Sequence, residues 1–158
     1  MKEPKHILVV TRTTGRCHDA VHYAISLSQK CGATLHVLHV MDDAITNGQG
    51  WNLSAPRLIP PDEHGRMLQK TKEELDAVIN TKRWKGVHVI ALIRAGNPRK
   101  VVRQVAAEKD IDLIIMPDRE QWRVERFLLG SGNPYPLRRM PCSILTVKRE
   151  SAGPAPAI

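Results

Sequence analysis

Aromatic residues, long apolar runs and paired cysteines are scarce or absent in this sequence. Three Trp, two Tyr and one Phe among 158 residues leave too few rings for a surface on which nucleic-acid bases stack. No apolar run approaches the roughly 20 residues that cross a bilayer, and the short apolar N-terminal segment is typical of a strand rather than a signal peptide. Cys17, Cys31 and Cys142 lack metal-ligand spacing, which predicts reduced thiols in a cytoplasmic protein with no membrane partner.

Positive charge is the marked imbalance, at a formal net charge of +8. Such a balance favours phosphate, nucleic acid or anionic surfaces as partners. Because the basic residues are spread along the chain and aromatic residues are few, we expect a solvated basic surface and no nucleic-acid partner. Two stretches are nevertheless enriched: Lys82, Arg83, Lys85, Arg94, Arg99, Lys100 and Arg103, and then Arg119, Arg123, Arg126, Arg138 and Arg139.

Apolar runs alternate with amphipathic segments along the chain. Strands are predicted at residues 6–11, 34–40, 87–93, 113–116 and 142–148, and helices at 17–30, 62–81 and 97–108, with a short one at 132–140. Asn97 followed by Pro98 is a typical helix start, and Gly32 a typical helix end. The alternation predicts an α/β fold, a single doubly wound open sheet of five parallel strands with helices on both faces.

The length predicts one domain, residues 1–150, followed by a disordered proline-rich tail at 151–158. Residues 41–61 lack periodicity and are expected to be irregular. In a doubly wound sheet, ligands bind outside the carboxyl ends of the strands where the strand order reverses. The long polar loop between residues 116 and 142 is therefore the candidate site, although spacing alone does not tell which loop it faces.

Several smaller patterns favour structural over chemical roles. His18 and His22 could share one helix face, but without a third ligand they do not predict a metal site. His36 and His39 are three apart in a strand, so they face opposite sides and cannot form one site. Cys17 is expected to be structural. Since Ser131 lacks the spacing of a nucleophile elbow, we predict no catalytic residue and do not expect the protein to be an enzyme.

Six segments, in their order and spacing, resemble the universal stress protein family over about residues 5–149. They read KHILVVT, ATLHVLHVMDD, GVHVIALIRAGNP, DLIIMP, LLGS and RRMPCSILTVK. The resemblance implies the strand order 3-2-1-4-5. The loops after Thr11 and Met116 would then face each other across the point where the order reverses.

One branch of that family binds ATP through G-x2-G-x9-G-[ST], in which glycines allow backbone amides to approach phosphates. Here Gly130-Ser131 matches the end of the motif, but Pro117 and Glu120 occupy the two earlier glycine positions, and Arg12 stands where the family has an aspartate. The motif is thus degenerate, and no cofactor is expected, with ATP as the alternative. The candidate binding residues that the resemblance implies are Thr11, Arg12, Val40, Met116, Gly130, Ser131, Gly132 and Asn133.

The favoured function is therefore a cytoplasmic, dimeric stress-response or regulatory module that binds an unknown protein partner. The alternative is a nucleotide-binding switch, with weak ATPase activity at most, that uses the cleft after the first and fourth strands. The family resemblance implies a homodimer through the last strand, residues Ser143, Ile144, Leu145, Thr146 and Val147; a monomer whose tail covers this edge is the other possibility. Arginines near the cleft would also suit an anion other than ATP.

Overall fold

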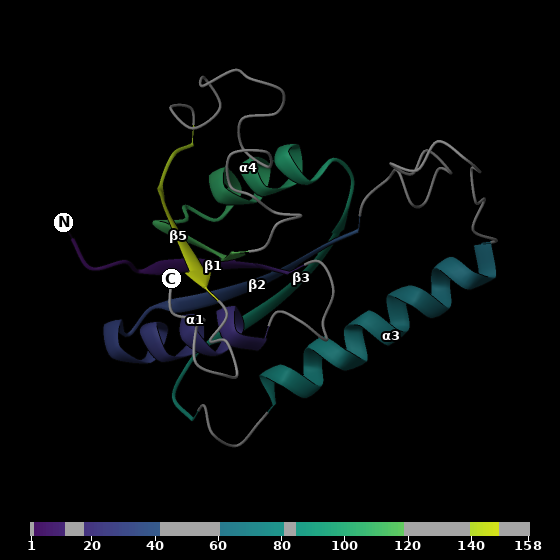
Figure 1. Cartoon of the computed structure of the whole chain (residues 1–158), viewed down its shortest axis with the longest axis horizontal. Helices are drawn as coiled ribbons and strands as arrows, with labels where there is room; N and C mark the ends of the chain where they lie inside the picture. The colour runs from purple at the N-terminus through teal and green to yellow at the C-terminus, as the bar shows by residue number, and fades with distance from the viewer. Residues whose placement is uncertain (1, 12–17, 42–60, 81–84, 119–139, 149–158) are drawn as a thin grey trace, which may run out of the picture.

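The structure, a computed structural model, describes residues 2–11, 18–41, 61–80, 85–118 and 140–148 (Figure 1). Their sheet has five strands, all parallel, in the order β3-β2-β1-β4-β5. This confirms the predicted fold class and strand order. In chain order the elements are β1 (His6–Thr11), α1 (His18–Cys31), β2 (Thr34–Met41), α3 (Pro61–Ile79), β3 (Val89–Ala95), α4 (Pro98–Glu108), β4 (Leu113–Asp118) and β5 (Ser143–Lys148).

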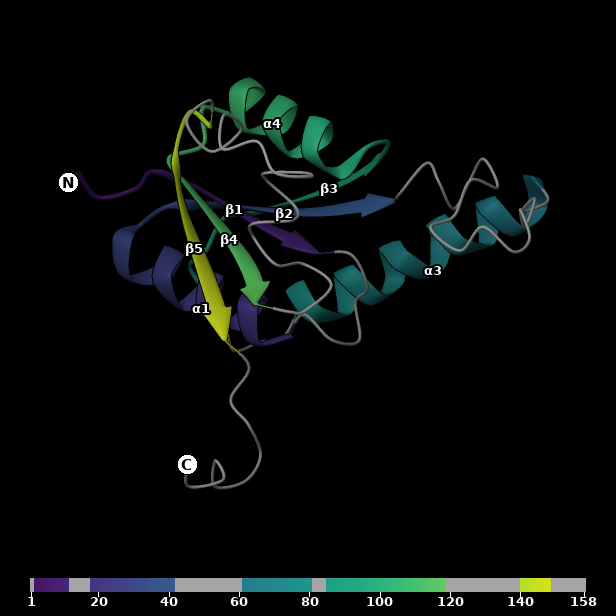
Figure 2. The same ribbon diagram turned by 45° about the horizontal axis from the view of Figure 1, so that its top comes forward.

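The two faces of the sheet are covered by different helices (Figure 2). Helix α4 packs on one face, where it forms a core with Leu8, Leu38 and Ile114. Helices α1 and α3 lie on the other, where the core contains Ile7 and Val9, the residues of odd number in β1 that precede Thr11. Alternate residues of the central strands are therefore buried on both sides, which explains why these strands are continuous apolar runs rather than alternating ones. None of the described helices is long and apolar enough to span a membrane.

The central strand β1 pairs unequally with its two neighbours. Its ladder with β2 runs over the whole strand, from His6↔Thr34 to Thr11↔His39. Its ladder with β4 runs only from Ile7↔Leu113 to Val9↔Ile115, although β1 continues to Thr11 and β4 to Asp118. The strand order reverses between these two strands, so the point at which a doubly wound sheet binds ligands is also the point at which the ladder ends early.

The amino-terminal edge of the sheet is held by a side chain. The Asp112 Oδ2 atom accepts hydrogen bonds from the backbone N–H groups of Lys5 (2.8 Å) and His6 (2.9 Å). The Asp112 N–H in turn donates to the His6 carbonyl at 2.9 Å. Backbone hydrogen bonds to the carboxylate favour its charged form and lower the pKa of Asp112.

Helix α4 begins and ends with recognisable caps. Asn97 Oδ1 accepts from the N–H groups of Arg99 (3.1 Å) and Lys100 (3.4 Å), and Pro98 is the first helical residue, as predicted. At the other end, Asp110 has a φ of 50°, and the Ile111 N–H donates to the Ala106 carbonyl at 3.0 Å. This bond between residues five apart, around a left-handed residue, is the Schellman motif.

Among the strands, the predicted boundaries differ most from the structure in β3 and β4. Strand β3 begins at Val89 rather than 87 and extends to Ala95, and β4 extends beyond Met116 to include Pro117 and Asp118. Because N–H groups alternate sides along a strand and that of Asp112 faces β1, the nitrogen of Pro117 faces the edge strand β5. The proline therefore costs at most one bond to an edge strand, and it does not end β4.

The remaining predictions on organisation fall mostly outside the described residues. These are the tail at 151–158, nearly all of the irregular segment at 41–61, and the short helix at 132–140 except for its last residue. The helix end predicted at Gly32 is confirmed, since this glycine has a φ of 64° just after α1.

Candidate functional site at the carboxyl edge of the sheet

Three of the predicted binding residues lie at the carboxyl ends of neighbouring strands. Thr11 ends β1, Val40 is near the end of β2 and Met116 is in β4. All three are buried, with relative exposures of 2%, 1% and 0%. The other five, Arg12, Gly130, Ser131, Gly132 and Asn133, lie outside the described residues.

The structure brings together two of these three residues and separates the third. Val40 and Met116 belong to the core under α4. Thr11 instead belongs to the odd-numbered side of β1, which faces α1 and α3, and its Oγ1 atom lies 3.3 Å from His39 Nδ1. That all three residues lie near the same ends of their strands does not place them on the same face, because successive side chains of a strand point to opposite faces of the sheet.

His39 is a buried polar residue of this edge that was not among the predicted site residues. It is 5% exposed and paired with Thr11 in the β1–β2 ladder. The Thr11 hydroxyl donates to the Leu38 carbonyl at 3.3 Å. Since a hydroxyl has one proton, the tautomer that satisfies both contacts has the hydrogen on His39 Nδ1, which then donates to Thr11 Oγ1. A histidine inside an apolar strand was the sequence signal that could have identified it.

The electrostatics of this pair favour a neutral imidazole. Burial lowers the pKa of His39, and the negative charge of Glu74 in α3 partly opposes that effect. A neutral ring whose Nδ1–H donates to Thr11 Oγ1 fixes the orientation of that hydroxyl. Among the described residues, no three His, Cys, Asp or Glu side chains form a group that could hold a metal ion.

Pro117, which the family resemblance aligns with the first glycine of the ATP motif, lies inside strand β4. It is buried and pairs with Val147 of β5 in the ladder that runs from Leu113↔Ser143 to Asp118↔Lys148. A proline in this position offers no backbone N–H, and its φ is restricted to about −65°. This position is therefore part of the sheet and not of a loop.

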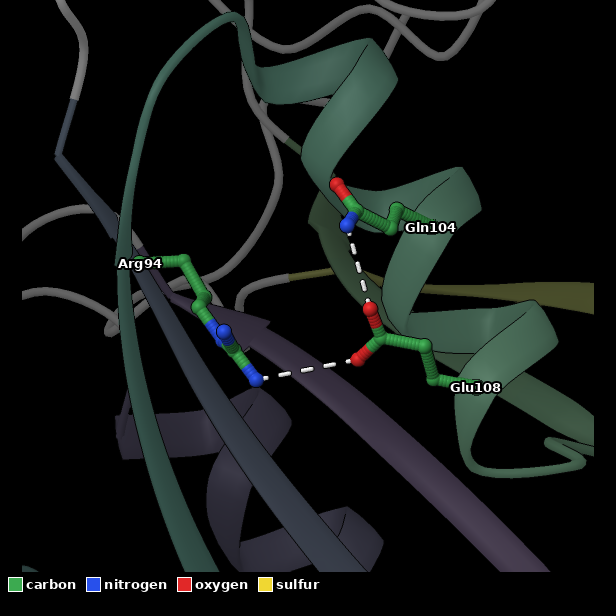
Figure 3. A network of polar contacts seen from close by, with 3 residues as sticks. All are labelled: Arg94, Gln104 and Glu108. Carbon is green, nitrogen blue, oxygen red and sulfur yellow. Dashed lines mark hydrogen bonds and ion pairs between the residues drawn. The ribbon is translucent and has the colours of Figure 1, made fainter.

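A polar network on the α4 face engages part of the predicted basic surface (Figure 3). The Arg94 guanidinium in β3 lies 3.6 Å from Glu108 Oε2, and Gln104 Nε2 donates to the other carboxylate oxygen of Glu108 at 3.0 Å. The Arg94 and Glu108 side chains are 46% and 41% exposed, so solvent screens their attraction. The network links the edge strand β3 to α4 and supports the interpretation of these basic residues as a solvated surface.

The chain belongs to the universal stress protein family, because the model of that family matches residues 3–148. Among curated relatives, it is similar to the universal stress protein MJ0531 of Methanocaldococcus jannaschii. The two are 25% identical over 150 residues, which cover 92% of this chain and 82% of the relative. The resemblance inferred from the six sequence segments is thereby confirmed at the level of the family.

Solved structures of low sequence identity have the same fold. The hypothetical protein MJ0577 matches with a TM-score of 0.70 at 18% identity, over 96% of this chain and 100% of that one. A universal stress family protein of Arabidopsis thaliana with AMP bound matches with a TM-score of 0.59 at 19% identity, over 94% of each chain. A universal stress protein in complex with cAMP matches with a TM-score of 0.58 at 16% identity, over 93% of this chain and 98% of that one.

Proposed function

We propose that this universal stress family protein is a cytoplasmic, dimeric regulatory module that acts through a protein partner and does not bind ATP in the ordinary way. The observation that carries the proposal is the position of Pro117, which is buried within β4 at the first glycine position of the ATP motif. A phosphate loop needs free backbone amides and glycine-like conformations, and a proline in a paired strand supplies neither.

Two further substitutions in the sequence support the loss of ATP binding. Glu120 places a negative charge at the second glycine position, where it would repel phosphates. Arg12 replaces the aspartate that the family resemblance assigns to the nucleoside. The Arg12 and Arg119 side chains would instead favour a smaller anion near the strand ends.

The dimer is proposed to form through β5, one of the two edge strands of the sheet. Ile144, Leu145 and Val147 are only partly buried, so an apolar strip lies along an edge whose backbone can pair with a second copy. We expect Thr146→Lys, at an exposed position of β5, to shift the protein towards monomer in sedimentation experiments. Ala91→Lys is the matched control, because Ala91 is an exposed residue of the other edge strand, β3. Dimers sensitive to Ala91→Lys alone would contradict this assignment.

The second candidate function is a nucleotide-binding switch at the same edge. It is favoured by the AMP and cAMP bound to structural relatives and by the early end of the β1–β4 ladder. In this alternative, with weak ATPase activity at most, Thr11, Val40 and Met116 would border the nucleotide, and the segment around Gly130 to Asn133 would contact its phosphates.

Titration calorimetry with ATP, AMP and cAMP distinguishes the two functions, after mass spectrometry of the purified protein for a retained nucleotide. We expect no retained nucleotide and no micromolar binding of ATP. The triple variant Arg12→Asp, Pro117→Gly, Glu120→Gly restores the motif and should gain ATP binding. The control is Arg103→Asp, on the exposed side of α4, which makes the same change of charge as Arg12→Asp and should gain no ATP binding. Micromolar ATP binding by the unaltered protein would favour the switch.

A further inference from the structure

Three histidines form a row across the amino-terminal edge of the sheet, on the face that α4 covers. His6 in β1 pairs in register with Thr34, and His36 in β2 pairs with Leu8 on one side and Ile90 on the other. The backbone of His88 accepts the Leu35 N–H at 2.9 Å, which extends the register to the residue before β3. Because all three have the parity of Leu8 and Leu38, they share the α4 face.

His36, at the centre of this row, is buried without a hydrogen-bond partner among the described residues. Its side chain is 3% exposed, and both Nδ1 and Nε2 lack a partner, as does the buried Nδ1 of His6. The His6 and His36 rings lie side by side with centroids 5.8 Å apart and an interplanar angle of 44°. Buried polar atoms are normally satisfied, so an unpartnered imidazole requires an explanation.

The charges that act on His36 all oppose a positive ring. Burial is the main cause that lowers the pKa of His36, and the charges of His6 on β1, Lys109 after α4 and His88 before β3 lower it further. On the same face, Glu108 faces Arg94 at 3.6 Å. The Asp112 carboxylate, at the start of β4, accepts the backbone N–H groups of Lys5 and His6. Glu74 acts on His39, on the opposite face.

The turn that contributes Lys109 joins α4 to β4. Its residues 109–111 contain the strained Asp110, and its two described hydrogen bonds are Lys109 N–H to the Val105 carbonyl and Ile111 N–H to the Ala106 carbonyl, each 3.0 Å. Ile111 is buried in the core under α4. A positive charge on His36 would therefore be buried within the repulsion of Lys109. It would also arise opposite Leu8, which belongs to the same core as Ile111.

We propose that His36 is the sensor of an acid-responsive latch, in which protonation of its ring loosens the 109–111 turn from the amino-terminal edge of the sheet. The proton is the ligand, since no described group of three side chains is arranged for a metal ion. This role is independent of the nucleotide question, because the row lies at the opposite end of the strands from Thr11 and Met116.

The direction of the pH dependence follows from linkage. A histidine whose pKa is lower in the folded state binds fewer protons there than in the unfolded chain. Its contribution to stability is fully present above the ordinary value of 6.5 and is lost as the pH falls from 6.5 towards the folded value. For each pH unit by which the pKa of His36 is lower in the folded state, the ratio of folded to unfolded protein falls by up to about tenfold at acid pH.

Hydrogen exchange measured at several pH values, corrected for intrinsic rates, tests the latch directly in the full chain. The Ile111 amide should lose protection, by up to about tenfold, between pH 7.5 and 5.5. The matched control is the Ala33 amide after α1, which makes the same type of bond, to the Ser28 carbonyl at 2.9 Å, on the face opposite His36. Equal loss of protection at both amides, or none at Ile111, would overturn the proposal.

Two variants separate the latch from general acid sensitivity. His36→Leu should make the protection of Ile111 independent of pH over this range, and Lys109→Gln should raise the titration midpoint of His36 as followed by imidazole NMR. The NMR titration of unaltered protein also serves if His36→Leu fails to fold. A folded-state midpoint for His36 at or above its value in the urea-unfolded chain would contradict the proposal.

Discussion

The turn from α1 into β2 and the turn from α4 into β4 have the same backbone pattern but different residues. Each has a left-handed residue, with φ of 64° at Gly32 and 50° at Asp110. Each closes with a bond between residues five apart, Ala33 to Ser28 and Ile111 to Ala106. The first turn has glycine, the residue that this conformation favours, whereas the second holds an aspartate there under strain. The comparison indicates that the α4–β4 turn is stabilised by its surroundings and the α1–β2 turn by its own backbone.

The largest expected difference between the turns concerns the residue that follows the left-handed position. Ile111 is 4% exposed and packs in the core under α4, where Ala106 also lies. Ile111→Ala should lower the free energy of unfolding by about 3 kcal/mol, as in other large-to-small core substitutions. The equivalent residue of the first turn, Ala33, has less to lose, and Ala33→Gly should cost about 1 kcal/mol. Urea unfolding measures both, and equal costs would contradict the comparison.

The second difference lies in the hydrogen bonds that the residue after each turn makes with the start of β1. Beyond the α4–β4 turn, Asp112 accepts the N–H groups of Lys5 and His6, where β1 begins. Beyond the α1–β2 turn, Thr34 instead donates its own N–H to the Lys5 carbonyl at 2.9 Å. We expect Asp112→Asn to cost about 1–2 kcal/mol at pH 7, a range reduced for solvent exposure.

The pH dependence of that cost has a definite sign. Because the folded-state pKa of Asp112 lies below its ordinary value of 3.8, its contribution is present above that pH and is lost as the pH falls through the folded value. Unfolding of the two proteins from pH 7 downwards should therefore show a difference that decreases once the pH falls below 3.8. A difference that persists in acid would indicate a steric effect of the substitution.

Exchanging the left-handed residues should have opposite effects in the two turns. Asp110→Gly relieves strain and should stabilise the protein by about 1 kcal/mol, whereas Gly32→Asp should destabilise it by a similar amount. A Cβ atom at Gly32 would meet nothing within 4 Å, so the cost there is conformational and not steric. Thermal unfolding of the two variants and the double exchange tests this, since distant effects should add.

A smaller effect is expected at the residue whose carbonyl closes each turn. In the first turn this is Ser28, whose buried hydroxyl has no partner among the described residues, and in the second it is Ala106. Ser28→Ala should therefore be neutral or stabilising by about 0.5 kcal/mol, because it removes a desolvated hydroxyl that gains no hydrogen bond. A clear loss of stability in urea unfolding would reveal a partner for this hydroxyl.

The smallest effect concerns the ion pair beside the α4–β4 turn. Glu108→Gln removes the attraction to Arg94, which is screened because both side chains are substantially exposed. The cost should be below about 0.5 kcal/mol and should vanish in 1 M salt. Unfolding at low and high salt measures it, and a cost that salt does not change would contradict a purely electrostatic contribution.

Local signals in the sequence predicted most of the fold and little of the site. Asn97-Pro98 and Gly32 predicted helix limits correctly because caps depend on a few adjacent residues. The opposite faces of His36 and His39 also followed from strand periodicity alone. Pro117 was misplaced in a loop, because its tolerance in β4 depends on which neighbour its nitrogen faces. Five of the eight candidate binding residues lie outside the described residues and stay predictions.

The sequence by itself determined the alternation of strands and helices, since apolar runs and caps act over a few residues, and family resemblance then supplied the strand order. Tertiary structure alone decided which polar residues meet. Thr11 and His39 are 28 residues apart, and Asp112 is 106 residues from the His6 amide it binds. Such contacts depend on strand register and on burial, which arise only when distant segments pack, and the same packing leaves His36 without a partner.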